Sequence, residues 1–139
     1  EGRDKQVREE QTPTLRNFLT ARDVARLLFE LETGVAVNQK YSEKAKSLMK
    51  RDFAVEDTKE YDSIRGFLGE SLPRDSVELY SKPGWTSGSR QDAAIIYDTV
   101  SGARYILVVI GDDKGYSTDE DIFPAISGYV YEQMSQLGG

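Results

Sequence analysis

The spacing of apolar residues in this sequence changes at Leu72-Pro73 from the period of helices to that of strands, and it changes back near Ser117. Apolar residues recur at helical spacing before the change, whereas they alternate or run continuously over 77–81, 93–99 and 105–110. The period at which apolar residues recur indicates whether a segment forms a helix or a strand. The order of elements therefore predicts an α+β fold, with an antiparallel three-stranded meander flanked by helices.

The first helix is marked by its two ends. Thr20 and Asp23 fit a capping box, in which hydroxyl and carboxylate accept from free N–H groups of the first turn. Gly34 stands where a left-handed C-terminal cap belongs. Residues 1–19 are mostly polar, so we expect a lead-in followed by a single domain over 20–139. The residues expected to point inward from this helix are Val24, Leu27, Leu28 and Leu31.

Three further helices are expected. The second begins at Ser42, a shorter one covers 62–68, and the last opens at Ser117 or Thr118. Their expected inward residues are Ala45, Leu48 and Met49 in the second, Ile64, Phe67 and Leu68 in the third, and Ile122, Ile126, Tyr129, Val130, Met134 and Leu137 in the last.

The strand over 105–110 is continuously apolar from Ile106 onward, and Ser101-Gly102 predicts a hairpin turn that joins it to 93–99. Such a run is normally covered on both faces, but the last strand of a three-stranded meander lies at an edge. Long apolar edges promote aggregation. We therefore expect this edge to pair with a missing N-terminal part, with residues 1–19 folded back, or with a second copy of the chain. The second copy is preferred if the chain is a 139-residue fragment, because the polar lead-in is a poor strand.

The composition excludes several kinds of chemistry. The chain has no Cys and no His, so disulfides, thiolate nucleophiles, Ser-His-Asp triads and His-based metal sites are absent. The net charge of −6 argues against a general nucleic-acid surface. No stretch approaches the roughly 18 apolar residues of a membrane span. The acids after Ile110 do not match a calcium loop. We expect no metal and no cofactor, and acid–base chemistry would depend on carboxylates, Lys or Tyr.

The segment from Lys82 to Arg90 is the richest in candidate site residues. A Lys at a strand end and an Arg on the next strand place two cations near one sheet edge, and we expect the N–H groups of Gly84 to Thr86 to face the same space. Fixed charge, a bidentate donor and open backbone donors are what a substrate carboxylate needs. The alternative is an ordinary Gly-rich hairpin with solvated cations and a core Trp85, which on spacing alone is the commoner arrangement.

Lys82-Pro83-Gly84 resembles the K-[ST]-G motif of the penicillin-recognising serine enzymes, whose other motifs are S-x-x-K and S-D-N. The resemblance is closest to class A β-lactamases and follows their order and spacing over roughly 19–135. It is carried by Leu19–Leu28, Gly34, Ser42, Leu72-Pro73, Lys82, Gly88–Arg90, Asp92 and Ile122–Ile126. It implies the C-terminal part of a β-lactamase/transpeptidase-like fold, whose last strand pairs with an N-terminal strand, and an extracytoplasmic location.

The resemblance also implies roles for individual residues. Lys82 matches the motif lysine that stabilises the field of the active site and meets the substrate carboxylate, and Arg90 matches an arginine that binds the same carboxylate. The backbone N–H of Trp85 would be one of two oxyanion-hole donors. Gly84 and Thr86 complete the predicted substrate-binding edge.

The resemblance has one departure and one large gap. Pro83 stands where the family has Thr or Ser, so a hydroxyl is lost. The family's nucleophilic serine, lysine base, S-D-N group and deacylating glutamate would all precede residue 19. The string Ser47-Leu-Met-Lys50 matches S-x-x-K literally, but it lies inside a predicted amphipathic helix and in the wrong part of the fold.

Two functions remain open. The chain is either the C-terminal portion of a β-lactamase-like serine hydrolase, binding a small-molecule or peptide substrate through its carboxylate, or a degenerate binding or structural module. Its first residue is Glu, which fits a processed protein or a fragment. We expect the chain alone to be inactive, because it lacks the nucleophile.

Overall fold

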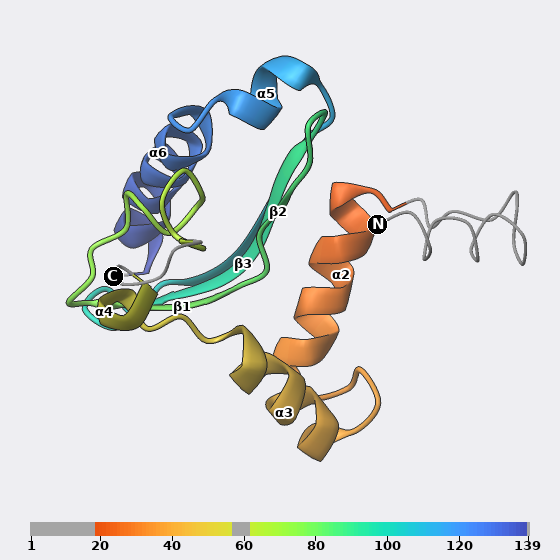
Figure 1. Cartoon of the computed structure of the whole chain (residues 1–139). Coiled ribbons are helices and arrows are strands. Elements are labelled where there is room, and N and C mark those ends of the chain that lie inside the picture. The colour runs from red at the N-terminus through yellow and green to blue at the C-terminus, as the bar shows by residue number, and fades with distance from the viewer. Residues whose placement is uncertain (1–18, 57–61, 139) are drawn as a thin grey trace, which may run out of the picture.

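The computed structural model describes residues 19–56 and 62–138 of the chain. An antiparallel sheet lies between helices, with α6 against one face and α2 against the other (Figure 1). The elements in chain order are α2 (Ala21–Glu32), α3 (Gln39–Met49), α4 (Phe53–Glu56), β1 (Val77–Ser81), β2 (Gly84–Trp85), β3 (Arg90–Asp98), β4 (Arg104–Gly111), α5 (Lys114–Thr118) and α6 (Ile122–Leu137). The predicted α+β class and antiparallel meander are confirmed.

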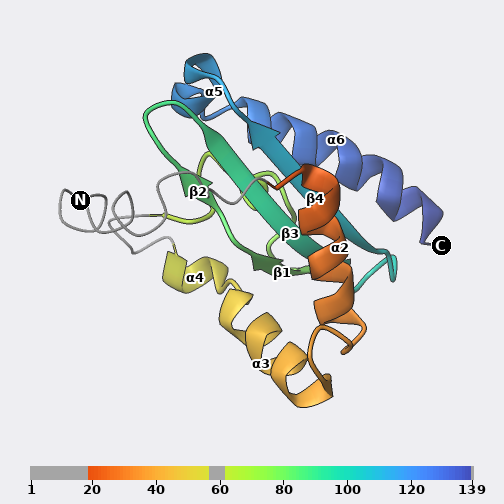
Figure 2. The ribbon, with the colours of Figure 1, turned by 90° about the vertical axis from the view of Figure 1, so that its right-hand side faces the viewer.

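Strand β3 is the centre of the sheet (Figure 2). β4 pairs with one edge of β3, while β1 and β2 share the other edge. Ser81 lies opposite Ala94 and Gly84 opposite Gln91, so the register does not shift between β1 and β2. The two short strands therefore act as one edge strand, which is interrupted only at Lys82 and Pro83. The Gly- and Ser-rich segment 82–90 is therefore a turn only in part, because it contains β2.

Alternate residues of β3 enter two hydrophobic cores. Ala94 and Ile96 belong to the core beneath α6, and Ala93 and Ile95 belong to the core beneath α2. This is the reason for the nearly continuous burial of β3, since a central strand covered on both faces buries both sets of side chains.

The first helix is confirmed, including its capping box and the left-handed Gly34, whose φ is +80°. The prediction that Leu27 points inward is wrong, because its side chain is exposed. The second helix begins earlier than predicted: the side chain of Asn38 accepts from the N–H of Tyr41 and caps it, so α3 starts at Gln39. Leu48, also predicted to be inward, is exposed.

The helix predicted over 62–68 is wrong. The segment forms consecutive turns, with Gly66 at a φ of +71°, although Ile64, Phe67 and Leu68 are buried as expected. The backbone there bonds to distant partners instead of to itself. The N–H of Leu68 donates to the Asp92 carboxylate at 3.2 Å, and the Leu68 carbonyl accepts from Ser127 Oγ at 2.6 Å.

The single final helix is also wrong, because α5 and α6 are separate. The Asp113 carboxylate accepts from the N–H of Gly115 and caps α5. The Asp119 carboxylate accepts from the N–H groups of Asp121 and Ile122 before α6. A helix that continued through Asp119 could not satisfy these donors in this way. Two residues expected in the apolar stripe, Tyr129 and Leu137, are exposed, whereas Phe123 and Ser127 are the buried residues of α6.

The predicted hairpin between β3 and β4 is confirmed with a longer turn, over 99–103, in which Gly102 has a φ of +76°. No strand pairs with the other edge of β4 within 19–56 and 62–138. The predicted lead-in lies outside the described residues apart from Leu19. None of the described helices is long and apolar enough to span a membrane.

Candidate functional site at the β1–β2 edge

The edge strand formed by β1 and β2 turns its backbone groups alternately toward β3 and away from it. The N–H of Lys82 donates to the Ala93 carbonyl at 2.9 Å, and the N–H of Thr86 donates to the Ser89 carbonyl at 2.8 Å. Every second residue of an antiparallel strand faces its neighbour. The N–H of Trp85, between these inward positions, therefore points to the outer edge of the sheet.

The same alternation explains why Pro83 is tolerated. Pro83 lies one residue after the inward Lys82, so its missing N–H would have pointed away from β3 and no ladder hydrogen bond is lost. The expectation that all N–H groups from Gly84 to Thr86 face one space is wrong. Thr86 donates within the turn, and Gly84 faces β3 by alternation. Only the Trp85 N–H of these three is directed outward.

Lys82 is exposed at the start of this outer edge. Its Nζ donates to the carbonyl oxygen of Pro83 at 2.6 Å, so the ammonium group reaches the edge rather than the core. The same outer edge is occupied just before this point by Arg51. The backbone N–H of Arg51 donates to the Leu79 carbonyl at 2.8 Å, and its guanidinium donates to the Ser81 carbonyl at 2.7 Å and to Ser81 Oγ at 3.1 Å.

The turn after Trp85 is closed by its own side chains. Thr86 Oγ1 lies 2.9 Å from Ser89 Oγ and accepts from the N–H of Gly88 at 3.2 Å. Ser117 Oγ of α5 lies 3.2 Å from the carbonyl oxygen of Ser87 and 2.8 Å from that of Lys114, and it shares its one proton between them. These contacts hold the turn, and with it the end of the candidate edge, against α5.

Arg90 is 5% exposed, and its guanidinium is directed into the molecule. It donates to the Gly66 carbonyl at 2.7 Å and to the Ser117 carbonyl at 3.4 Å, and it lies 3.8 Å from the Glu120 carboxylate. Its Cζ stacks on the Phe67 ring, 4.8 Å from the centroid. Arg90 thus joins three segments of the chain, and carboxylate binding by Arg90 stays a prediction.

Asp92 is the buried carboxylate next to this edge, and it is 1% exposed. Its oxygens accept from the N–H of Leu68 and from its neighbour Ala93, the latter at 2.8 Å. Burial raises the pKa of Asp92 to about 6, even though these hydrogen bonds and the charges of Arg51 and Lys82 lower it. The positive charges of Arg51 and Lys82 therefore both act on the Asp92 carboxylate.

The literal S-x-x-K string is not brought to the edge as a catalytic pair. Ser47 Oγ donates to the Lys44 carbonyl one turn back in α3, at 2.7 Å. Lys50 Nζ lies over the Tyr80 ring, 5.9 Å from its centroid. The part of the chain that the structure describes also contains no group of three or more acids that could hold a metal ion.

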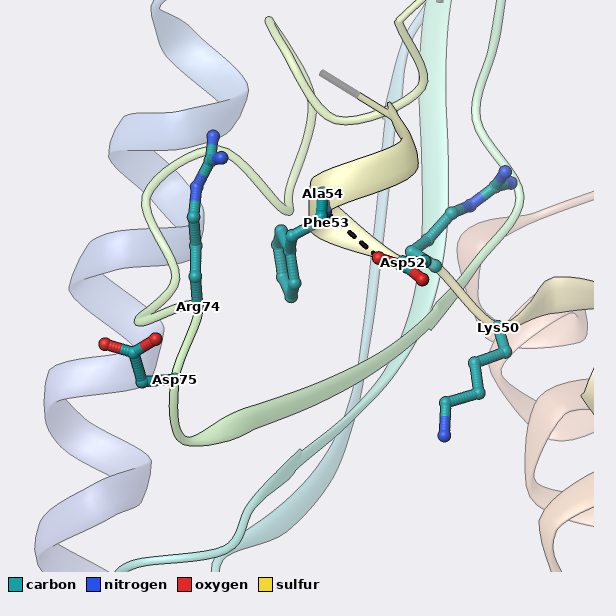
Figure 3. Close-up of a pocket in the computed structure, with 7 residues that line it drawn as sticks. Lys50, Asp52, Phe53, Ala54, Arg74 and Asp75 are labelled. Carbon is teal, nitrogen blue, oxygen red and sulfur yellow. Dashed lines mark hydrogen bonds between the residues drawn. The ribbon is translucent and has the colours of Figure 1, made fainter. Parts of the chain in front are cut away.

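A separate pocket of about 570 Å³ lies between the end of α3 and the turn before β1 (Figure 3). Its charged side chains do not converge on one point: Lys50 and Arg74 point in different directions, and Asp52 accepts from the N–H of Ala54 at 3.1 Å. Arg74 stacks on Phe53, 5.7 Å from the ring centroid. This pocket therefore offers no arrangement comparable to the β1–β2 edge.

The comparisons with known proteins identify the family. The model of the β-lactamase enzyme family matches residues 3–134. This chain belongs to that family. No curated protein matches it significantly.

Solved β-lactamase-like structures share the fold. The β-lactamase from Sphaerobacter thermophilus DSM 20745 is 20% identical with a TM-score of 0.64, over 90% of this chain and 43% of that one. PBP-A is 18% identical with a TM-score of 0.66, over 96% and 50%. A representative of class A β-lactamase from Bacteroides cellulosilyticus DSM 14838 is 22% identical with a TM-score of 0.60, over 83% and 41%. The chain thus spans half or less of each of these proteins.

As a β-lactamase family member, the chain carries Lys82-Pro83-Gly84 on an edge strand, with the Trp85 N–H directed outward. Sequence reasoning missed Arg51, which covers the preceding part of the edge from 30 positions away, and it missed the contact between Phe67 and Trp85. No sequence signal points to Arg51, because its partner Ser81 is distant in the chain. The apolar character of Phe67 predicted its burial but not its neighbour.

Proposed function

We propose that this chain supplies the substrate-carboxylate edge of a β-lactamase-like serine hydrolase, while the nucleophile comes from a part of the protein outside it. The observation that carries the proposal is the pairing of an exposed ammonium group, Lys82, with an outward N–H three residues later, at Trp85. An ammonium group attracts a carboxylate, and an edge N–H can donate to the carbonyl oxygen of an acyl group.

In the proposed reaction, a serine from the absent part attacks the carbonyl carbon of the bound substrate. Negative charge then develops on the carbonyl oxygen, and the Trp85 N–H would stabilise it. Lys82 would hold the substrate carboxylate, with Gly84 and Thr86 lining the same edge. Arg90 is the second predicted cation, and it would have to exchange the Gly66 or Ser117 carbonyl for the substrate.

The comparisons support a small-molecule substrate. A mutant of PBP-A was solved as an acyl-enzyme complex with penicillin G, and it matches this chain with 16% identity, a TM-score of 0.66 and coverage of 83% of this chain and 39% of that one. We therefore propose a β-lactam, or a peptide with a comparable carboxylate, as the ligand of the edge. The missing N-terminal part, or a second copy, is the proposed partner of the β4 edge that no strand within 19–56 and 62–138 covers.

The proposal is tested by titrating the full chain with penicillin G and following the amide resonances of Gly84 and Trp85. We expect both to shift, and Lys82→Gln to weaken binding several-fold, since one ion pair near the surface is lost. Lys40→Gln is the matched control, because Lys40 is exposed on α3. Equal binding by the Lys82→Gln variant, or no shift at the edge, would contradict the proposal.

The second candidate, a non-catalytic binding module, is favoured by one observation, the loss of a hydroxyl at Pro83. The sequence of the whole gene distinguishes the hydrolase from the binding module. An S-x-x-K motif followed by S-x-N upstream of this segment would identify the enzyme. In either case we expect the chain alone to hydrolyse no chromogenic cephalosporin, because the remaining groups only assist a nucleophile. Turnover that is abolished by Ser47→Ala would overturn this expectation.

A further inference from the structure

Another pocket, of about 330 Å³, lies between α2 and the sheet, on the face opposite α6. Val24, Leu27 and Leu28 line it from α2, and its floor includes Ala93 of β3 and Val108 of β4. Its volume is within the range of small-molecule sites, which are mostly apolar with a few polar groups. The pocket also accounts for the 52% exposure of Leu27, because this side chain borders the open space beneath the helix.

The floor of this pocket crosses three neighbouring strand segments and has a charged end. The N–H of Lys82 donates to the Ala93 carbonyl at 2.9 Å, and Ala93 lies opposite Val108 in the register. Residues that lie opposite each other share a face of the sheet, so the Lys82 side chain is on the α2 face, where Lys82 lines the pocket. Neighbouring strands are about 4.8 Å apart, so the floor extends roughly 10 Å from Lys82 to Val108.

The charges that line the pocket favour an anionic group at the Lys82 end. Lys82 Nζ donates to the Pro83 carbonyl, which leaves two ammonium protons for a further acceptor. The other charged residue of the lining is Asp92, but alternation turns its side chain to the opposite face, where its carboxylate accepts from the N–H of Leu68. An alkyl chain along the floor would bury its methylene groups against β3, β4 and α2 while its carboxylate meets Lys82.

We propose that this pocket binds the alkyl chain of a free aliphatic carboxylate about eight carbons long, which matches the length of the floor, with its carboxylate at Lys82 and the end of its chain at Val108. Charge complementarity favours this occupant over a purely apolar segment of protein, which would leave the ammonium group without an anion. The inference rests on the proposed function, because it takes Lys82 as the carboxylate contact.

The test is a titration of the full chain with butyrate, hexanoate, octanoate and decanoate, followed through the amide resonances of Gln91 and Val108. Each buried methylene group strengthens binding about fourfold, so octanoate should bind at least about tenfold more tightly than butyrate even if half of its added methylene groups stay exposed. The gain should end near octanoate, whose chain reaches the far end of the floor. An equal gain from octanoate to decanoate would indicate adsorption without a defined pocket and would overturn the inference.

Variants separate the alkyl chain from the charge. Leu27→Gln should reduce the ratio of the butyrate and octanoate dissociation constants several-fold and leave butyrate binding unchanged, because one apolar wall of the pocket is lost. Leu and Gln have similar helix propensities, so α2 should persist. Leu48→Gln is the matched control, since Leu48 is 78% exposed on α3 and does not line the pocket, and it should leave the ratio unchanged. Lys82→Gln should weaken all four ligands by the same factor.

The possible failures are distinguishable. If butyrate binding depends on Lys82 but longer chains gain nothing, or if Leu27→Gln keeps the gain, the inference about the pocket is wrong and the carboxylate edge stands. If longer chains gain nothing and sedimentation shows a dimer that octanoate does not dissociate, a second copy fills the pocket, and the inference is equally wrong. If no ligand binds in a Lys82-dependent way, the proposed carboxylate edge itself is wrong, and the inference fails with it.

Discussion

The substitution Asp92→Asn should remove a large pH dependence from the stability of the chain. Asp92 is almost completely buried between β3 and the 66–68 turn, and it accepts from two backbone N–H groups. Burial nevertheless dominates and raises its pKa from the ordinary value of 3.8 to about 6. The native state therefore retains this proton at a pH where the unfolded chain has released it.

The sign and the size of the effect follow from this difference. Between about pH 4 and 6 the native state binds more protons at Asp92 than the unfolded state does, so the free energy of unfolding falls as the pH rises. Each pH unit corresponds to about 1.36 kcal/mol, so the whole interval is worth about 3 kcal/mol. Asn cannot ionise, and it has a single accepting oxygen, so it loses one of the two hydrogen bonds that Asp92 accepts, a cost that does not depend on pH. The loss of stability with rising pH should therefore be absent in the variant.

The assay is urea unfolding of the full chain between pH 4 and 7.5, followed by the fluorescence of Trp85, its only tryptophan. The difference between the unfolding free energies of Asp92→Asn and wild type should grow by about 3 kcal/mol over this range. Subtracting the wild-type value from that of the variant cancels the pH dependence contributed by Asp23 and Asp98, whose pKa values are lowered by hydrogen bonds from Thr20 and Ser101. The exposed Asp112→Asn is the control. Parallel pH profiles for Asp92→Asn and wild type would refute the reasoning.

Three further predictions concern stability and the outer edge of β4. Gly66→Ala should lower the free energy of unfolding, measured in urea, by at least about 1–2 kcal/mol, because φ is +71° and the new Cβ would lie 2.7 Å from the Arg90 guanidinium. The control Gly88→Ala, whose Cβ meets nothing within 4 Å, should lower it far less. Phe123→Ala should cost about 3–5 kcal/mol by the same measurement, and a loss below 1 kcal/mol would mean that α6 is not part of the core. The amide of Leu107 faces β3, whereas strand alternation turns the amide of Val108 to the outer edge of β4. In hydrogen exchange both amides should be equally protected, because we expect the outer edge to be paired. Rapid exchange of Val108 alone would show that the edge is unpaired.

The sequence by itself determined those features that depend on neighbours in the chain. The capping box at Thr20 and the left-handed Gly34 were predictable because each is satisfied within one helical turn. The three long strands were predictable from their apolar period, and their pairing as a meander follows from short connections. The Lys82-Pro83-Gly84 motif was sufficient, with its flanking pattern, to indicate the family that the comparisons confirmed.

Only the tertiary structure decided where polar side chains find their partners. Residues 62–68 have the apolar spacing of a helix, but Arg90, Asp92 and Ser127 bond to the Gly66 and Leu68 backbone from 24 to 59 positions away and stabilise turns instead. The burial of Arg90 has the same origin, since its partners come from separate segments. A buried polar group must be paired, and which distant group pairs with it depends on how the elements pack, which local periodicity does not encode.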